Sequence, residues 1–242
     1  MSRLTGIEVE GYRRDGYHRF TEQVFAKDRM DRLGEIFEEH VSAAGARRTD
    51  ELDTPHIEDH RLLEFLLAEE VADLVEPLIG PDIGLFSSHF IAKEPRTGRP
   101  TPWHEDSAFW QSRFSDFSRI VTVWLALDDV DRENGCMAVI PGTHDNGFSA
   151  YRTLADGDSY TFEKEIEGVD ENSAVYLELR RGQASLHDSR IIHGAKANTS
   201  PRRRAGYTMR YFNTSARVLR QEFPVWLVRG TDKDGGNPFV NG

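Results

Sequence analysis

The texture of the sequence changes at Ile83, and this change constrains the fold more than any other feature. Beyond it the chain consists of short runs rich in Val, Ile, Phe, Tyr and Trp, separated by Gly, Pro, Asn and Asp. Such runs are typical of short strands joined by turns. We predict strands near 84–93, 101–106, 119–128, 136–140, 174–179, 183–187, 190–193 and 205–213. About eight strands of this length favour a small antiparallel barrel or jelly roll.

The first third of the chain has a helical pattern instead. Apolar residues recur at near-helical spacing from Phe20 to Glu39 and again from Asp59 to Leu78. Pro77 and Gly80-Pro81 are expected to close the second helix. Helices followed by strands, without a linker between them, predict a single α+β domain, mainly β, over residues 1–242.

Composition excludes several classes of partner and location. Thirty basic and 41 acidic residues give a net charge of −11, which disfavours nucleic acid and anionic membranes. Cys136 is the only cysteine, so no intramolecular disulfide can form and a reducing compartment fits best. The longest apolar run, Ile120 to Leu127, is far shorter than the roughly 20 residues of a membrane span. We expect a soluble, cytoplasmic monomer or homodimer that acts on a small molecule.

The first chemical signal is His104 followed two residues later by Asp106. On a strand, residues i and i+2 point to the same face, so this imidazole and this carboxylate could share one metal ion. By itself such a pair is more often a polar strand edge than a metal site, and it needs support from elsewhere in the chain.

That support comes from a later segment, in which His193 precedes Gly194 and is followed eleven residues later by Arg204. Two histidines and one carboxylate on one face of a metal leave three positions open, as in non-haem Fe(II) oxygenases. A 2-oxoacid could take two of these positions and dioxygen the third. An arginine on the next strand could then pair through two parallel donors with the distal carboxylate of 2-oxoglutarate.

Four blocks of the sequence carry a resemblance to a known family. They are the opening GYRRDGYHRF, PWHED around His104, VTVWLALDDVDRENGCMAVIPGTH from Val121 to His144, and an HGxxxNxSxxxR pattern from His193 to Arg204. From about Ile7 to Val240 the chain resembles the phytanoyl-CoA dioxygenase family of Fe(II)/2-oxoglutarate oxygenases.

The resemblance implies a double-stranded β-helix, a cupin-like jelly roll, with supporting N-terminal helices. It implies Fe(II), 2-oxoglutarate and dioxygen as cofactor and co-substrates, with ascorbate supporting activity. The implied reaction hydroxylates a small metabolite while 2-oxoglutarate is converted to succinate and CO2. Related halogenases carry Ala or Gly in place of the carboxylate, so Asp106 favours oxygen insertion, desaturation or ring chemistry over halogenation.

The resemblance also assigns roles to individual residues. His104, Asp106 and His193 match the iron ligands, Arg204 matches the arginine that binds the distal carboxylate, and Trp124 matches a tryptophan of the co-substrate pocket. The chain departs from the family at Ala195, where serine is common, and at Ser87-Ser88, near a frequent glutamine.

Trp110 follows the metal pair closely and is expected at the mouth of the substrate pocket, with core packing as the alternative.

Several alternatives stay open at this stage. His187-Asp188 is a second histidine–carboxylate pair, for which we expect a place in the barrel wall and a hydrogen bond to a metal ligand. His56 and His60 have metalloprotease spacing, but Ile57 replaces the required Glu, so a solvated helix start is expected.

The rival function is a metal-binding barrel without oxygenase activity, either a 2-oxoacid sensor or a non-redox enzyme. Arg204 argues against it, since a bare metal scaffold needs no such cation. Alternation along the strand predicts that Arg204 points inward, and the orientations of Arg202 and Arg203 are left open.

Overall fold

Two antiparallel sheets face each other in the computed structural model, which describes residues 4–45, 48–155, 159–232 and 235–240. The large sheet has the strand order β1-β10-β5-β12-β3-β13, with β2 added against β3. Its strands are β1 (Tyr17–Phe20), β2 (Leu52–Asp53), β3 (Ile83–Lys93), β5 (Ile120–Ala126), β10 (Ala184–Asp188), β12 (Arg204–Asn213) and β13 (Trp226–Arg229).

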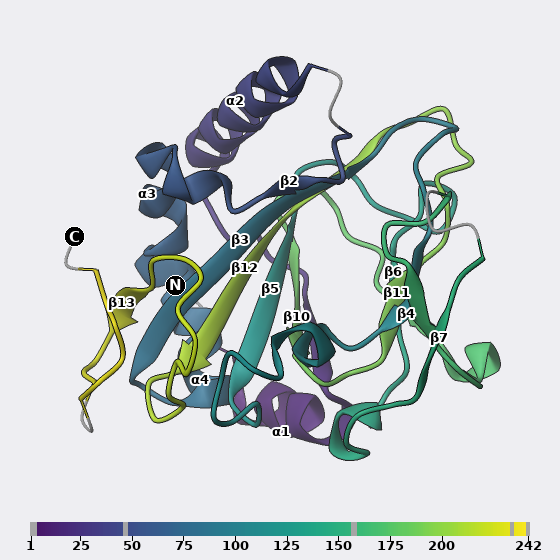
Figure 1. The fold of residues 1–242 in the computed structure, drawn as a ribbon. Helices are drawn as coiled ribbons and strands as arrows, with labels where there is room; N and C mark the ends of the chain where they lie inside the picture. The colour runs from purple at the N-terminus through teal and green to yellow at the C-terminus, as the bar shows by residue number, and fades with distance from the viewer. Residues whose placement is uncertain (1–3, 46–47, 156–158, 233–234, 241–242) are drawn as a thin grey trace.

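The small sheet lies to the right of the large sheet in Figure 1 and has the order β4-β11-β6-β9. Its strands are β4 (Thr101–His104), β6 (Met137–Val139), β9 (Val175–Tyr176) and β11 (His193–Ala195). A separate hairpin joins β7 (Tyr151–Thr153) to β8 (Lys164–Ile166). Two facing antiparallel sheets with these crossovers form the predicted jelly roll.

Helices cover the outer face of the large sheet, the face turned away from the small sheet (Figure 1). They are α1 (Gly6–Asp15), α2 (Lys27–Ala44), α3 (Leu63–Leu66) and α4 (Glu69–Ile79). Leu33 of α2 and Val71 of α4 are fully buried in the main apolar core, together with Val123 of β5. In the described ranges, each helix is too short or too polar to cross a lipid bilayer.

Alternation along the strands separates the main core from the chemistry. On β5, Val121 and Val123 belong to the core against the helices. The alternate residues Thr122 and Trp124 point the other way and line a cavity between the sheets. Strand β12 shows the same pattern, with Met209 in the core and the residues on either side of it in the cavity wall. The space between the two sheets is therefore the place for a site.

Two strand boundaries differ from the sequence prediction at the metal half-sites. The strand predicted over 101–106 ends at His104, because Asp106 opens a short 3-10 turn, Asp106–Trp110. The strand predicted over 190–193 begins only at His193. The other six predicted strands overlap β3, β5, β6, β9, β10 and β12.

The helix predictions were less accurate than the strand predictions. The segment predicted as one helix from Phe20 begins as the end of β1, and α2 starts only at Lys27. The helix predicted over 59–78 is broken where Ala68 adopts an extended backbone, with φ −67° and ψ 137°. Pro77 lies inside α4, near its end, and Gly80 at φ 98° terminates the helix.

The prediction of a solvated helix start at His56 was wrong. His56 lies in a 3-10 turn, Pro55–Ile57, and is fully buried, whereas His60 is exposed. The Nδ1 atom of His56 lies 2.7 Å from the hydroxyl of Ser88, and the His56 ring packs edge-on against Trp226. Burial lowers the pKa of His56 to about 4, so the ring is neutral at physiological pH.

Candidate metal centre

Two histidines and one aspartate come together on the inner side of the small sheet. His104 of β4 and His193 of β11 are direct cross-strand partners, and their ring centroids are 4.0 Å apart. Asp106 Oδ1 lies 3.7 Å from His104 Nε2 and 3.9 Å from His193 Nε2. One donor atom from each residue lies within 4.8 Å of the others, and all three residues are buried. The arrangement could hold one metal ion.

Backbone carbonyls set the tautomers of both histidines. His104 Nδ1 donates to the carbonyl of Pro102 at 2.8 Å, and His193 Nδ1 donates to the carbonyl of Ile191 at 3.0 Å. The proton is thereby assigned to Nδ1, which leaves the Nε2 lone pair of each ring directed toward Asp106. Burial, with His104 and His187 nearby, holds the pKa of His193 well below its ordinary value. The Nε2 atoms of both rings are therefore available as metal ligands.

The carboxylate of Asp106 is oriented by a neighbour that the sequence analysis did not single out. Thr122 of β5 donates its hydroxyl to Asp106 Oδ2 at 3.0 Å. Burial alone would raise the pKa of Asp106, but Arg210 and the nearby histidine rings hold it well below its ordinary value. Asp106 is therefore an anion with one oxygen held by Thr122 and the other facing His104 and His193.

His187 lies beside this group but does not make the hydrogen bond predicted for it. It lies on β10, in the wall of the cavity, with its Nε2 3.7 Å from Asp106 Oδ2, which is too long for a hydrogen bond. Neither ring nitrogen has a hydrogen-bond partner among the described residues. The adjacent Asp188 is occupied by an ion pair with Arg190 at 3.0 Å.

Arg204 points into the same cavity, as strand alternation predicted. Its side chain is buried, and its guanidinium carbon lies 4.6 Å from the ring centroid of Trp124 on the neighbouring strand. Gly206 makes room for this stack, because a side chain there would collide with the Trp124 indole. Within the described chain, Arg204 has no carboxylate partner. Burial without such a partner lowers the pKa of Arg204 to about 10.

The polar residues of the HGxxxNxSxxxR pattern hydrogen-bond to the backbone of the turn that precedes Arg204. Asn198 donates its side-chain amide to the carbonyls of Lys93 and Arg202, at 3.1 and 2.6 Å. Ser200 donates its hydroxyl to Asn198 Oδ1 at 2.9 Å. Lys93, which sequence reasoning missed, is fully buried and donates to the carbonyls of residues 195 and 196. These bonds hold the turn between β11 and β12 and so fix where Arg204 begins its strand.

The metal-facing residues and Arg204 line a cavity of about 500 Å³ between the sheets. The two metal-facing histidines, Asp106, Trp124 and Arg204 line it together, and Ala195 and Ser87 form part of the same wall. Ser88 faces the opposite side of β3, where it bonds to His56. Trp110 also lines the cavity, and its ring lies 5.0 Å from Phe86. Trp110 therefore both lines the cavity and packs against another aromatic ring.

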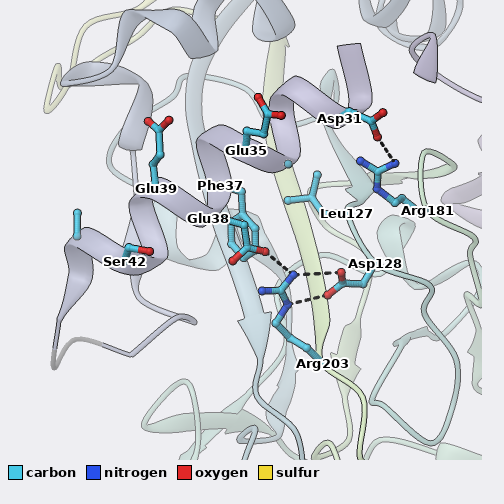
Figure 2. A pocket seen from close by; sticks show the side chains of 12 residues that line it. Asp31, Glu35, Phe37, Glu38, Glu39, Ser42, Leu127, Asp128, Arg181 and Arg203 are labelled. Carbon is cyan, nitrogen blue, oxygen red and sulfur yellow. Dashed lines mark hydrogen bonds and ion pairs between the residues drawn. The ribbon is translucent and has the colours of Figure 1, made fainter. Parts of the chain in front are cut away.

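A larger hollow of about 1000 Å³ lies elsewhere, on the outer side of α2 (Figure 2). Its two arginines are already paired: Arg203 contacts Asp128 at 2.9 Å and Glu38 at 2.7 Å, and Arg181 contacts Asp31 at 3.0 Å. It contains no histidine or cysteine. This groove is larger than the cavity between the sheets, but its paired arginines and the lack of histidine in its lining make it a poorer candidate for a metal or anion site. The groove also settles the side to which Arg203 points, opposite to Arg204.

The sequence analysis also missed Glu105, which lies between His104 at the end of β4 and Asp106 at the start of the following turn. It is fully buried and turns away to accept hydrogen bonds from the hydroxyl of Ser149 at 2.5 Å and from its backbone amide. The phenol of Tyr151 donates to the same carboxylate at 3.4 Å. Glu105 thus anchors the segment before and within β7 to the half-site that carries His104 and Asp106.

Comparisons with known proteins agree with this geometry. The family described as phytanoyl-CoA dioxygenase matches residues 12–206. Peroxisomal phytanoyl-CoA dioxygenase of Bos taurus is 32% identical over 149 residues, 59% of this chain and 43% of that protein. A probable alpha-ketoglutarate-dependent hypophosphite dioxygenase of Stutzerimonas stutzeri is 29% identical over 156 residues, 63% of this chain and 53% of that protein. The chain spans about half the length of these relatives.

Solved structures with the same fold include the non-heme monooxygenase ThoJ, with a TM-score of 0.78 and 24% identity over 96% of this chain and 86% of that one. The alpha-ketoglutarate-dependent carbocyclase SnoK has a TM-score of 0.70 and 24% identity over 90% of this chain and 88% of that one. These likenesses establish the jelly-roll fold. The family match covers most of the sequence and both metal half-sites. The chain belongs to the phytanoyl-CoA dioxygenase family.

Proposed function

We propose that this protein is an Fe(II)- and 2-oxoglutarate-dependent dioxygenase that hydroxylates a small-molecule substrate. One observation carries the proposal: two imidazole nitrogens and a carboxylate converge in the same cavity as a buried arginine that has no carboxylate partner in the described chain. A metal site alone needs no such arginine, whereas a dicarboxylate co-substrate does.

The donor set fits Fe(II). His104 and His193 would ligate through Nε2, and Asp106 through the oxygen that Thr122 does not hold. Bound there with 2-oxoglutarate, iron would supply the activation of dioxygen that yields succinate, CO2 and a hydroxylated product.

The chain's own residues would bind and orient the co-substrate. Arg204 offers two parallel N–H donors to the distal carboxylate, and Trp124 supports the guanidinium from one face. The aromatic rings of Phe109 and Phe162 pack against each other, with centroids 5.1 Å apart and planes tilted by 39°, and line the cavity near His104. They would limit the access of water to the metal.

Related proteins differ in their named reactions and substrates. The relatives above are named for phytanoyl-CoA and hypophosphite, and solved structures of this fold are titled as a monooxygenase, a carbocyclase and an epimerase. Asp106 favours oxygen insertion, desaturation or ring chemistry over halogenation, and we propose hydroxylation as the outcome among these.

The test compares four histidine and aspartate variants. His104→Ala, Asp106→Ala and His193→Ala should each lose iron and reduce succinate formation from 2-oxoglutarate by at least about a hundredfold, because each removes one of three ligands. His187→Ala is the matched control, a buried histidine beside the same carboxylate, and it should retain iron and measurable turnover. Iron content, circular dichroism and succinate are measured for each variant. Iron binding without any succinate formation in the wild type would instead support the non-oxygenase barrel.

A further inference from the structure

Two arginines line the cavity on the side of Asp106 that faces Trp110. Arg113 follows the turn that begins at Asp106, and Arg210 lies on β12, six residues after Arg204. Both guanidinium groups lie over aromatic rings, Arg113 at 5.2 Å from Phe86 and Arg210 at 5.5 Å from Trp110.

Arg113 has too few partners for a buried cation. Its side chain is buried, and its one hydrogen bond in the described chain runs from Nη2 to the carbonyl of Phe86 at 3.3 Å. Its Nε has no acceptor, and no described carboxylate lies within 4.0 Å of its guanidinium. Burial accordingly lowers its pKa, with Glu222 and Asp53 acting in the opposite direction from farther away.

Arg210 is only partly neutralised. Its Nε lies 3.7 Å from Asp106 Oδ2, beyond hydrogen-bond distance, and Nη1 donates weakly to the hydroxyl of Ser87 at 3.4 Å. The same oxygen of Asp106 already accepts a hydrogen bond from Thr122. Arg210 can therefore act as a distant counter-ion of Asp106 and still present donors to the cavity.

Other arginines of the chain show what a structural role looks like. Arg229 pairs with Glu69, Asp73 and Glu76, and Arg203 pairs with Glu38 and Asp128. Each is balanced by carboxylates of the fold. Arg113 lacks this balance, and an uncompensated buried charge destabilises the folded state. A purely structural role would leave this cost unexplained, whereas a bound anion would remove it.

Building on the proposed function, we propose that Arg113 and Arg210 bind an oxyanion group, a carboxylate or a phosphate, of the primary substrate. Trp110 and Phe223, which line the same part of the cavity, would contact the apolar body that carries this group. The site is separate from Arg204, which would hold the distal carboxylate of 2-oxoglutarate. The cavity would thus hold two anions, one bound by Arg204 and the other by Arg113 and Arg210.

Calorimetric titration of simple probes tests the oxyanion site. Anaerobic protein is loaded with Fe(II) and saturating 2-oxoglutarate and then titrated with benzoate, phenyl phosphate or neutral benzyl alcohol. The wild type should bind at least one of the two anions and bind benzyl alcohol more weakly. The preferred anion identifies the substrate group as carboxylate or phosphate. Arg113→Gln and Arg210→Gln should each weaken anion binding about thirtyfold or more, and Arg113→Lys should weaken it less.

Two controls separate this site from the co-substrate site. Arg181→Gln, in the outer groove of Figure 2, should leave anion binding unchanged. Arg204→Leu should weaken 2-oxoglutarate binding, whereas Arg113→Gln should leave it within a few-fold. Thermal denaturation checks that each variant is folded, and the two glutamine variants at separate positions guard against the loss of one of them.

Each outcome is decisive for one proposal. If 2-oxoglutarate binds but the wild type binds neither anion, or both glutamine variants bind anions normally, the oxyanion site is wrong and the proposed function stands. If 2-oxoglutarate does not bind, the proposed function fails. Loss of anion binding in Arg113→Gln but not in Arg204→Leu would then still support the oxyanion site.

Discussion

The two faces of the large sheet come from the same strands but differ in how well their polar groups are partnered. On the outer face, Tyr211 donates to the carbonyl of Leu66 at 2.8 Å and Tyr207 donates to Ser88 at 3.0 Å. On the inner face, Arg204 has no carboxylate partner among the described residues, and both ring nitrogens of His187 lack a hydrogen bond.

The difference separates stability from binding. Outer-face residues are buried against the helices and lower the free energy of the folded state mainly through apolar burial, with added hydrogen bonds from Tyr207 and Tyr211. On the inner face, Arg204 is buried without a carboxylate partner in the described chain, which destabilises the free protein but prepares it for an anionic ligand. Substitutions on the two faces should therefore affect different measurements.

The largest effect is expected at Arg204 on the inner face. Arg204→Leu should weaken 2-oxoglutarate binding by about two to three orders of magnitude, since stranding one charge of a buried pair costs about 3–5 kcal/mol. The free energy of unfolding without ligand should not fall, because an uncompensated buried charge is removed. Arg204→Lys should recover part of the affinity.

Calorimetry with 2-oxoglutarate and chemical denaturation measure the two effects of Arg204→Leu. Wild-type affinity in this variant would overturn the assignment of Arg204, and Arg113 would become the candidate. A large loss of stability instead would contradict the proposed contrast between the faces.

Met209, on the outer face of the same strand, should show the opposite behaviour. Met209→Ala should lower the free energy of unfolding by about 2–5 kcal/mol, because Met209 is fully buried in the core against the helices. The affinity for 2-oxoglutarate should stay within about twofold of the wild type. Thr208→Ala, one residue earlier and in the cavity wall, is the matched inner-face control and should cost less stability. Equal losses in both variants would argue against the division of the sheet.

The outer face should also account for part of the pH dependence of stability. Burial lowers the pKa of His56 to about 4 in the folded protein, compared with 6.5 for an ordinary histidine. The unfolded chain therefore binds the proton first as the pH falls. Stability from this residue is complete above about pH 6.5 and is lost as the pH falls toward 4, by up to about 3 kcal/mol.

Urea denaturation between pH 7 and pH 4 measures this effect, and His56→Gln should flatten the profile. His60→Gln, which changes an exposed histidine four residues later, should change the slope much less, because burial is the main cause of the lowered pKa of His56 and the charge of His60 is only a minor one. An unchanged slope in His56→Gln would contradict the assignment.

Much of the architecture was predictable because it depends on local patterns. Apolar patterns predicted segments that overlap eight of the observed strands but missed β1, β2, β7, β8 and β13, and strand periodicity assigned Arg204 to the inner face. The spacing of His104 and Asp106 indicated one half-site, but it needed the later segment with His193 as support, and Asp106 lies in a turn rather than on the strand. Helix boundaries were predicted less well, since Ala68 breaks a helix without any glycine or proline to indicate it.

Only the tertiary structure decided which distant residues meet. His104 and His193 become partners through the pairing of β4 with β11 in the small sheet. Thr122 reaches Asp106 because β5, in the large sheet, faces the small sheet across the cavity. Arg210 shares the inward face of its strand with Arg204, but nothing in the sequence indicates that Arg113 lines the same cavity. The physical reason is that hydrophobic periodicity determines which side of a strand is buried, whereas sheet pairing over long sequence distances determines what each buried polar group will face.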